Sequence, residues 1–188
     1  MPLTKIDAVA ALIVIDLQKG LIAIPTVHPI GEIVSRAAQL AGGFRERGLP
    51  VVLVNVRGVA PGRTDAERPN LTRPDDWSDL LPELKQQPGD YVVTKETWGA
   101  FLGTTLDEYL RQRGVTQIFL AGLSTSVGVE STARSAYDLG YNVVTVVDAM
   151  TDRNLDAHNH SVARVFPRLS ETATTEGVVK MLKDAGAR

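Results

Sequence analysis

The chain has 188 residues, of which 44% are hydrophobic, 22% charged and 5% aromatic, proportions typical of a globular domain and not of a disordered or fibrous chain. Its 20 Lys and Arg residues against 22 Asp and Glu residues give a formal charge of -2, so we expect no nucleic-acid partner. The absence of cysteine excludes disulfides and a thiol nucleophile, and with three histidines we expect no metal site.

No segment of the chain resembles a signal sequence or a membrane span. The longest apolar run near the N-terminus, Ala8 to Ile15, is far shorter than the ~20 residues that a spanning helix needs. We therefore expect a cytoplasmic protein that makes no membrane contact.

Continuous apolar runs alternate with helical patterns along the chain. The runs that predict buried strands are Val9–Ile15, Val51–Val56, Tyr91–Thr94, Gln117–Ala121, Asn142–Val147 and Ser170–Ala173. Helical patterns occupy residues 30–47, 105–113, 126–139, 155–166 and 174–183, with capping-box spacing from Thr105 to Glu108. This order predicts one α/β domain over residues 1–188, a doubly wound parallel sheet of about six strands with helices on both faces.

Polar residues follow the ends of several predicted strands. Asp16 and Gln18 come after the first strand, Arg57 after the second and Lys95 after the third, while a glycine-containing helix entry at 122–128 follows the fourth. The irregular stretch 57–88 is longer than an ordinary connection, and such loops are often functional. Ligands of open parallel sheets bind beyond the carboxyl ends of the strands, so these residues form the candidate site.

Three segments resemble the signature segments of the isochorismatase-like hydrolase superfamily. They are Val14–Gln18, Lys95–Phe101 and Gly122–Ala133, in order over most of the chain. The resemblance implies a six-stranded sheet of order 3-2-1-4-5-6, an Asp-Lys-Cys catalytic triad and a homo-oligomer. It also implies a non-proline cis peptide just before the cysteine, with neighbouring backbone amides that bind an anion. We expect no cofactor.

Position by position, the resemblance gives the carboxylate role to Asp16 and the lysine role to Lys95, while the cysteine position falls on Gly128. Glycine has no side chain that attacks a substrate, so the covalent route of the nicotinamidase-like members is closed. The metal site of that branch is missing too, because Asn55–Gly58 replaces its Asp-x-His arrangement. The nucleophile is therefore absent.

The isochorismatases proper include members with glycine at this position, and they cleave the vinyl ether of isochorismate. That reaction needs an acid and no nucleophile, and we expect Asp16 to supply the proton. Burial would raise its pKa and the Lys95 cation would lower it, and the sequence leaves the balance open. Those isochorismatases carry a His where this chain has Ser124–Ser126, so another substrate stays open.

Several neighbouring residues are expected to contact a small, anionic substrate. Lys95 and Arg57 would supply cations, and the helix that starts near Ser126 would present free amides to an anion. The remaining expected substrate contacts are Gln18, Trp98, Phe101 and Val127.

We therefore expect an isochorismatase-like hydrolase that lacks the catalytic cysteine and works by acid-assisted, non-covalent hydrolysis. The alternative is a catalytically inactive relative that binds a metabolite or assembles as an oligomer, although retention of Asp16 and Lys95 argues against it. An amidase rebuilt on Ser124 or Ser126 ranks last, because no histidine base is predicted nearby. His158 and His160 point apart on a helix and are expected at the surface or in a subunit contact.

Overall fold

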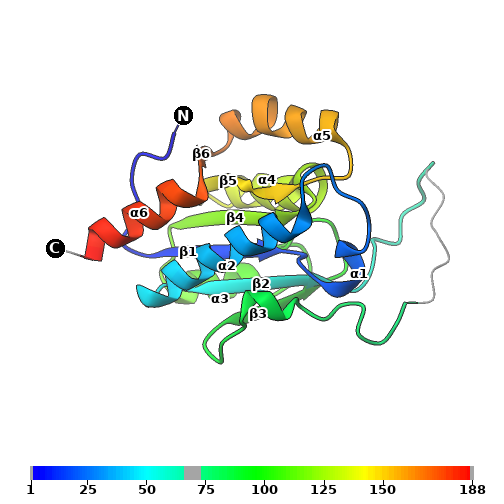
Figure 1. Cartoon of the computed structure of the whole chain (residues 1–188), viewed down its shortest axis with the longest axis horizontal. Coiled ribbons are helices and arrows are strands. Elements are labelled where there is room, and N and C mark those ends of the chain that lie inside the picture. The colour runs from blue at the N-terminus through cyan, green and yellow to red at the C-terminus, as the bar shows by residue number, and fades with distance from the viewer. Residues whose placement is uncertain (1, 66–72, 187–188) are drawn as a thin grey trace.

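A computed structural model describes residues 2–65 and 73–186 of the chain. Six strands form one parallel sheet in the order β3-β2-β1-β4-β5-β6, which confirms the predicted fold class and strand order (Figure 1). The strands are β1 Ala10–Ile15, β2 Val51–Val56, β3 Tyr91–Lys95, β4 Gln117–Leu123, β5 Asn142–Thr151 and β6 Glu171–Ala173. Every residue of β1 and β4 is buried, as continuous apolar strands in the middle of a parallel sheet should be.

Helices cover both faces of the sheet, each over its own hydrophobic cluster (Figure 1). One face carries α2 (Ile30–Glu46) and α6 (Thr175–Gly186), and the other carries α3 (Leu106–Gln112) and α4 (Glu130–Asp138). The shorter elements are α1 Lys19–Ile22, η1 Pro82–Leu84, η2 Thr125–Val129, α5 Leu155–His160, η3 Ser161–Val165 and η4 Phe166–Arg168. Each helix has an apolar face, and the strands are apolar on both sides. The sheet therefore lies between two layers of helices, as expected.

The winding of the sheet reverses between β1 and β4, because β2 and β3 lie on one side of β1 while β4, β5 and β6 lie on the other. Ile15, at the end of β1, lies opposite Val54 on one side and Gly122 on the other. Gly122 has a φ of +120°, and a Cβ there would stand 2.1 Å from the Ile15 carbonyl oxygen. Only glycine therefore lets the ends of β1 and β4 approach this closely at the switch point.

Two local predictions were wrong, and a third agrees with the described residues. Thr105 makes no side-chain cap at the start of α3, where the Thr104 hydroxyl instead accepts from the Leu106 amide. Strand β5 runs on to Thr151, beyond the predicted end. The stretch 57–88 was expected to be irregular, and its described part contains only η1, while 66–72 lie outside the described residues.

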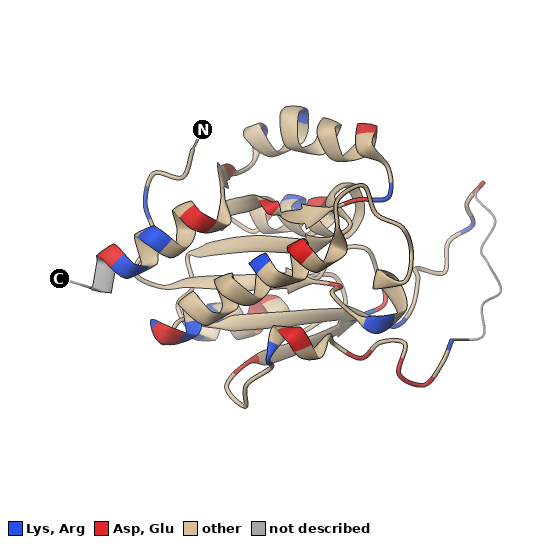
Figure 2. Cartoon of the chain, viewed as in Figure 1, with Lys and Arg blue, Asp and Glu red and all other residues tan. Residues whose placement is uncertain are grey.

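The helices carry Lys and Arg interspersed with Asp and Glu, as Figure 2 shows. Within the two described ranges, no helix combines the length and the apolar character needed to cross a bilayer.

Candidate functional site

The two residues at the centre of the predicted site meet in a buried ion pair. Asp16 follows β1, and Lys95 is the last residue of β3, so their side chains reach across the end of β2. Lys95 Nζ lies 2.8 Å from Asp16 Oδ2 and also donates to the Thr97 carbonyl at 3.0 Å. Exposure is 5% for Asp16 and 2% for Lys95, so the pair is nearly removed from water.

The Asp16 carboxyl is only half satisfied. Its Oδ1 atom is buried and has no hydrogen-bond partner among the described residues. Burial raises the pKa of Asp16 to about 6, although the Lys95 cation acts in the opposite direction. The backbone at Asp16 is left-handed, with a φ of +54°, which few non-glycine residues adopt outside turns and functional sites. Burial thus outweighs the cation, and the carboxyl keeps its proton to a higher pH than an ordinary aspartic acid does.

Gly128 lies against this pair from the other side of β1. It belongs to η2, a short π-helical turn that connects β4 to α4. A Cβ at this position would stand 3.3 Å from Asp16 Oδ2 and 3.0 Å from Ile15 Cγ2. The peptide bond between Leu123 and Ser124, which leads into the turn, is cis. The structure therefore brings Asp16, Lys95 and Gly128 together.

The amides of this turn are not free in the way the sequence suggested. Ser126 N donates to Asp152 Oδ2 at 2.7 Å, and Val127 N donates to the Ser124 carbonyl at 3.1 Å. The start of the turn does attract an anion, as its partial positive charge predicts, but the anion is the protein's own Asp152 carboxylate. The expectation of open amides at Ser126 and Val127 was wrong.

Two of the expected substrate contacts serve the interior. Gln18 is fully buried, and its amide accepts from the Val56 N–H at 2.7 Å and donates to the carbonyls of Val56 and Trp77. Phe101 is 8% exposed and stacks on Tyr141 in the core. Both side chains therefore serve the interior of the protein. The polar amide of Gln18 and the aromatic ring of Phe101 had suggested contact with a ligand.

Two other expected contacts lie at the surface beyond the strand ends. Arg57 follows β2 and is exposed, and its backbone N–H donates to the Lys95 carbonyl at 2.9 Å. Trp98 follows β3 and is 64% exposed. Arg57 and Trp98 thus remain candidates for contacts with a ligand that reaches Asp16 from outside.

Sequence reasoning missed a polar cluster behind η2. His158, expected at the surface, is 7% exposed, and its Nδ1 lies 2.8 Å from the Thr125 hydroxyl. Asp152 was missed because the fifth strand was predicted to end at Val147. With β5 extended to Thr151, Asp152 is the residue that follows the strand, which is the position that marks the other site residues.

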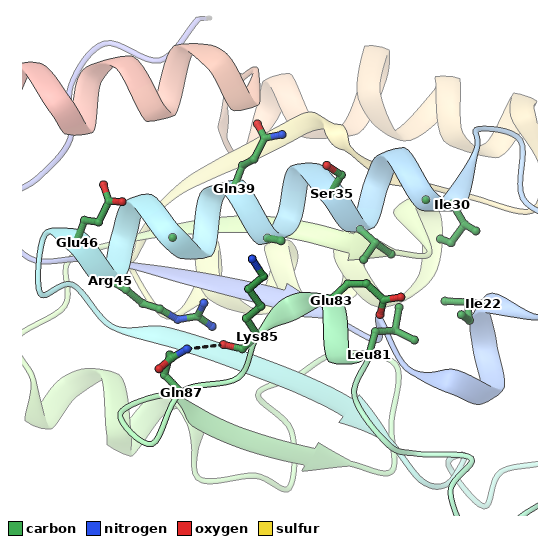
Figure 3. A pocket seen from close by; sticks show the side chains of 14 residues that line it. Ile22, Ile30, Ser35, Gln39, Arg45, Glu46, Leu81, Glu83, Lys85 and Gln87 are labelled. Carbon is green, nitrogen blue, oxygen red and sulfur yellow. Dashed lines mark hydrogen bonds between the residues drawn. The ribbon is translucent and has the colours of Figure 1, made fainter.

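A separate groove of about 780 Å³ runs between α2 and residues 81–87 (Figure 3). Its lining includes Ile22, Ile30 and Leu81, and the Lys85 side chain points toward α2. None of the expected site residues lines this groove. The candidate active site is therefore the cluster around Asp16.

The fold and the site define a doubly wound α/β protein with a buried Asp–Lys pair at the switch point of its sheet. The chain belongs to the isochorismatase family, because the model of the isochorismatase domain matches residues 10–177. It is 39% identical to the isochorismatase family protein YwoC of Bacillus subtilis, over 92% of this chain and 94% of YwoC.

Solved structures of the same family share the fold. An isochorismatase family protein from Burkholderia thailandensis is 41% identical, with a TM-score of 0.91 over 95% of this chain and 98% of that one. N-carbamoylsarcosine amidase from Thermoplasma acidophilum is 28% identical, with a TM-score of 0.72 over 89% of this chain and 97% of that one. The chain is thus a member of a hydrolase family.

Proposed function

We propose that this protein hydrolyses a small anionic substrate by acid catalysis without a covalent intermediate, and that the substrate is a vinyl ether of the isochorismate type. The observation that carries the proposal is the half-satisfied Asp16 carboxyl, buried beside Lys95 with its pKa raised to about 6. A chain without cysteine has no thiol for the acyl-enzyme route, so the acid is the strongest reagent that remains.

The chemistry needs one proton and one water. Asp16 gives its proton from Oδ1 to the methylene carbon of the enol ether, and the C=C electron pair forms the new C–H bond. Water adds to the resulting oxocarbenium carbon and gives its proton to the Asp16 carboxylate, which regenerates the acid. The hemiketal then collapses to pyruvate and a dihydroxy-cyclohexadiene carboxylate, with its hydroxyl proton passing to the leaving oxygen. Lys95 Nζ, 2.8 Å from Oδ2, stabilises the Asp16 carboxylate that remains after proton transfer.

Residues around the pair would bind the substrate. Arg57 supplies a cation and Trp98 an aromatic face, both exposed beyond the strand ends. Gly128 puts no side chain of its own beside Asp16 Oδ2, where an added Cβ would stand 3.3 Å from that oxygen and 3.0 Å from Ile15 Cγ2.

The direct test is to incubate the purified protein with isochorismate and to measure pyruvate. We expect turnover in the wild type and a loss of about 10²- to 10⁴-fold in Asp16→Ala and in Asp16→Asn, because neither variant carries an acidic proton. Turnover that is lost in Asp16→Ala but kept in Asp16→Asn would refute the acid role.

A panel of vinyl ethers, amides and esters extends the test beyond isochorismate. Turnover of another vinyl ether would keep the mechanism and change the substrate. Failure across the whole panel would favour the alternative, an inactive relative that binds a metabolite or serves assembly.

A further inference from the structure

The turn that carries Gly128 is held from behind by a buried hydrogen bond to a histidine. Thr125, the first residue of η2, is fully buried, and its hydroxyl lies 2.8 Å from Nδ1 of His158 on α5. Asp152, which follows β5, accepts from the next amide of the same turn, Ser126 N. Two elements distant in sequence thus fix the position of one short turn.

A second histidine with the same kind of partner lies against the first. His28 Nδ1 is 3.0 Å from the hydroxyl of Thr151, and that hydroxyl oxygen also accepts from the His28 backbone N–H at 3.2 Å. The two imidazole rings meet edge to face with centroids 4.7 Å apart. Both rings therefore pair Nδ1 with a buried threonine.

The available hydrogen-bond partners determine which atom donates in the contact between Thr125 and His158. The Thr125 hydroxyl has no other partner among the described residues, so its hydrogen is satisfied only if it donates to His158 Nδ1. The imidazole is then neutral, with its hydrogen on Nε2. A second proton, on Nδ1, would leave the buried Thr125 hydrogen without an acceptor and would place a cation against the His28 ring.

We propose that His158 is a positioning residue for the active site: its neutral ring accepts the Thr125 hydroxyl hydrogen and thereby holds η2, with Gly128, against Asp16. Protonation of His158 places a hydrogen on Nδ1. The ring then no longer accepts the Thr125 hydrogen, and η2 is held less firmly against Asp16. The link to catalysis rests on the proposed function, whereas the link between His158 and the turn does not.

The charged groups around His158 come from each element packed against it. His28 precedes α2, Asp152 follows β5, and Glu130 on α4 accepts from the Ser161 hydroxyl at 2.6 Å, just after α5. Burial and His28 lower the pKa of His158, and Asp152 acts against them. The net effect keeps the ring neutral at ordinary pH, which agrees with a His158 Nδ1 that accepts the Thr125 hydrogen.

Nuclear magnetic resonance tests the structural part without any substrate. The chain has three histidines, so His158→Gln and His160→Gln together assign all three ring signals. The exposed His160 lies on the same helix as His158, and His160→Gln serves as the matched control. We expect His158 to titrate below the usual value of a histidine, and the amide signals of residues 124–129 to shift with the His158 midpoint. Amides that do not follow this midpoint would overturn the proposal.

Variants of Thr125 separate the hydrogen bond from packing. Thr125→Val keeps the shape and removes the hydroxyl, and we expect it to raise the pKa of His158 and to shift the same amides. Thr125→Ser restores the hydroxyl and should restore the wild-type signals. If Thr125→Val fails to fold, the wild-type titration and Thr125→Ser still decide the question. Unmoved amides in a folded Thr125→Val protein would overturn the proposal.

Turnover then tests the link to catalysis. We expect Thr125→Val and His158→Gln each to lower kcat about tenfold while KM changes little. In the wild type, kcat should fall at low pH as His158 becomes protonated, and His158→Gln should lose this fall. Unchanged kcat in both, with wild-type turnover intact, would overturn the link and leave the proposed function standing. Absence of turnover in the wild type, with the amide shifts present, would instead count against the proposed function alone.

Discussion

Asp90 and Asp16 are both buried carboxylates beside a cation, but they accept different numbers of hydrogen bonds. Asp90 receives two bonds from Arg45, at 3.0 Å and 2.6 Å, and a third from the Gln87 backbone N–H at 2.8 Å. Asp16 receives a single bond from Lys95, and its Oδ1 has no partner among the described residues. Their side chains are similarly buried, at 3% and 7% exposure.

A buried carboxylate beside a cation therefore serves structure in one place and chemistry in the other. Asp90, whose bonds to Arg45 are bidentate, is stabilised as an anion and fastens the segment after η1 to α2. Asp16 is desolvated without enough donors, so burial raises its pKa to about 6 and a fraction of the molecules carries this proton at neutral pH. An incomplete buried carboxyl is costly for stability, and it is the kind of group that an acid catalyst needs.

The largest expected effect separates the two carboxyls by activity. We expect Asp16→Asn to lower kcat/KM by about 10²- to 10⁴-fold, the range for loss of a general acid, because the amide cannot deliver a proton. Asp90→Asn should leave kcat/KM of the folded protein near the wild-type value. Steady-state kinetics on both variants provides the measurement, and equal losses would show that Asp16 acts only through structure.

Stability should give the opposite order. We expect Asp90→Ala to lower the free energy of unfolding by about 3 kcal/mol, because it leaves the partly buried Arg45 without its counter-ion. Urea denaturation measures this, with Asp184→Asn as control, since the Lys180–Asp184 pair is exposed and should matter little. A small loss in Asp90→Ala would mean that Arg45 finds another partner.

The pH dependence sharpens the same contrast. The pKa of Asp16 is raised from 3.8 to about 6, so kcat/KM should fall about tenfold per pH unit on the alkaline side of that value. The folded protein also holds this proton more tightly than the unfolded chain does. Its stabilising contribution is complete below 3.8 and is lost as pH rises through about 6.

Asp16→Asn has no such titration at residue 16. The free energy of unfolding of Asp16→Asn minus that of the wild type should therefore increase as pH rises from 3.8 to about 6. Denaturation of both proteins at several pH values measures this difference. A difference that is constant with pH would contradict the raised pKa.

The sheet and the Asp16–Lys95–Gly128 cluster were predictable because both depend on chain order. Two-sided apolar runs fix a parallel sheet, and a parallel sheet gathers the residues after its strands at one edge. The roles of Gln18 and Phe101 were not predictable, because a polar or aromatic residue near a strand end fits either a ligand or the interior. His158 was missed because its partner Thr125 lies 33 residues away, and no local pattern signals that contact.

The smallest expected effect concerns Gly128, where the site differs from one with a thiol. A Cβ here would stand 3.0 Å from Ile15 Cγ2 and 3.2 Å from the Leu123 carbonyl, contacts that are tight but allow small shifts. Gly128→Ala and Gly128→Cys should therefore each cost about 1 kcal/mol of stability. Both variants also narrow the space beside Asp16, so vinyl ether turnover should fall in each.

The thiol itself is tested by comparing these two variants. Amidase activity, measured as ammonia released from a carbamoyl amide, should be absent in the wild type and in Gly128→Ala and should appear only in Gly128→Cys. The Cβ that the two variants share controls for the steric change, so activity confined to Gly128→Cys comes from the sulfur acting beside Asp16 and Lys95. Wild-type stability and full vinyl ether turnover in Gly128→Ala would instead show that the reacting atoms lie away from this turn.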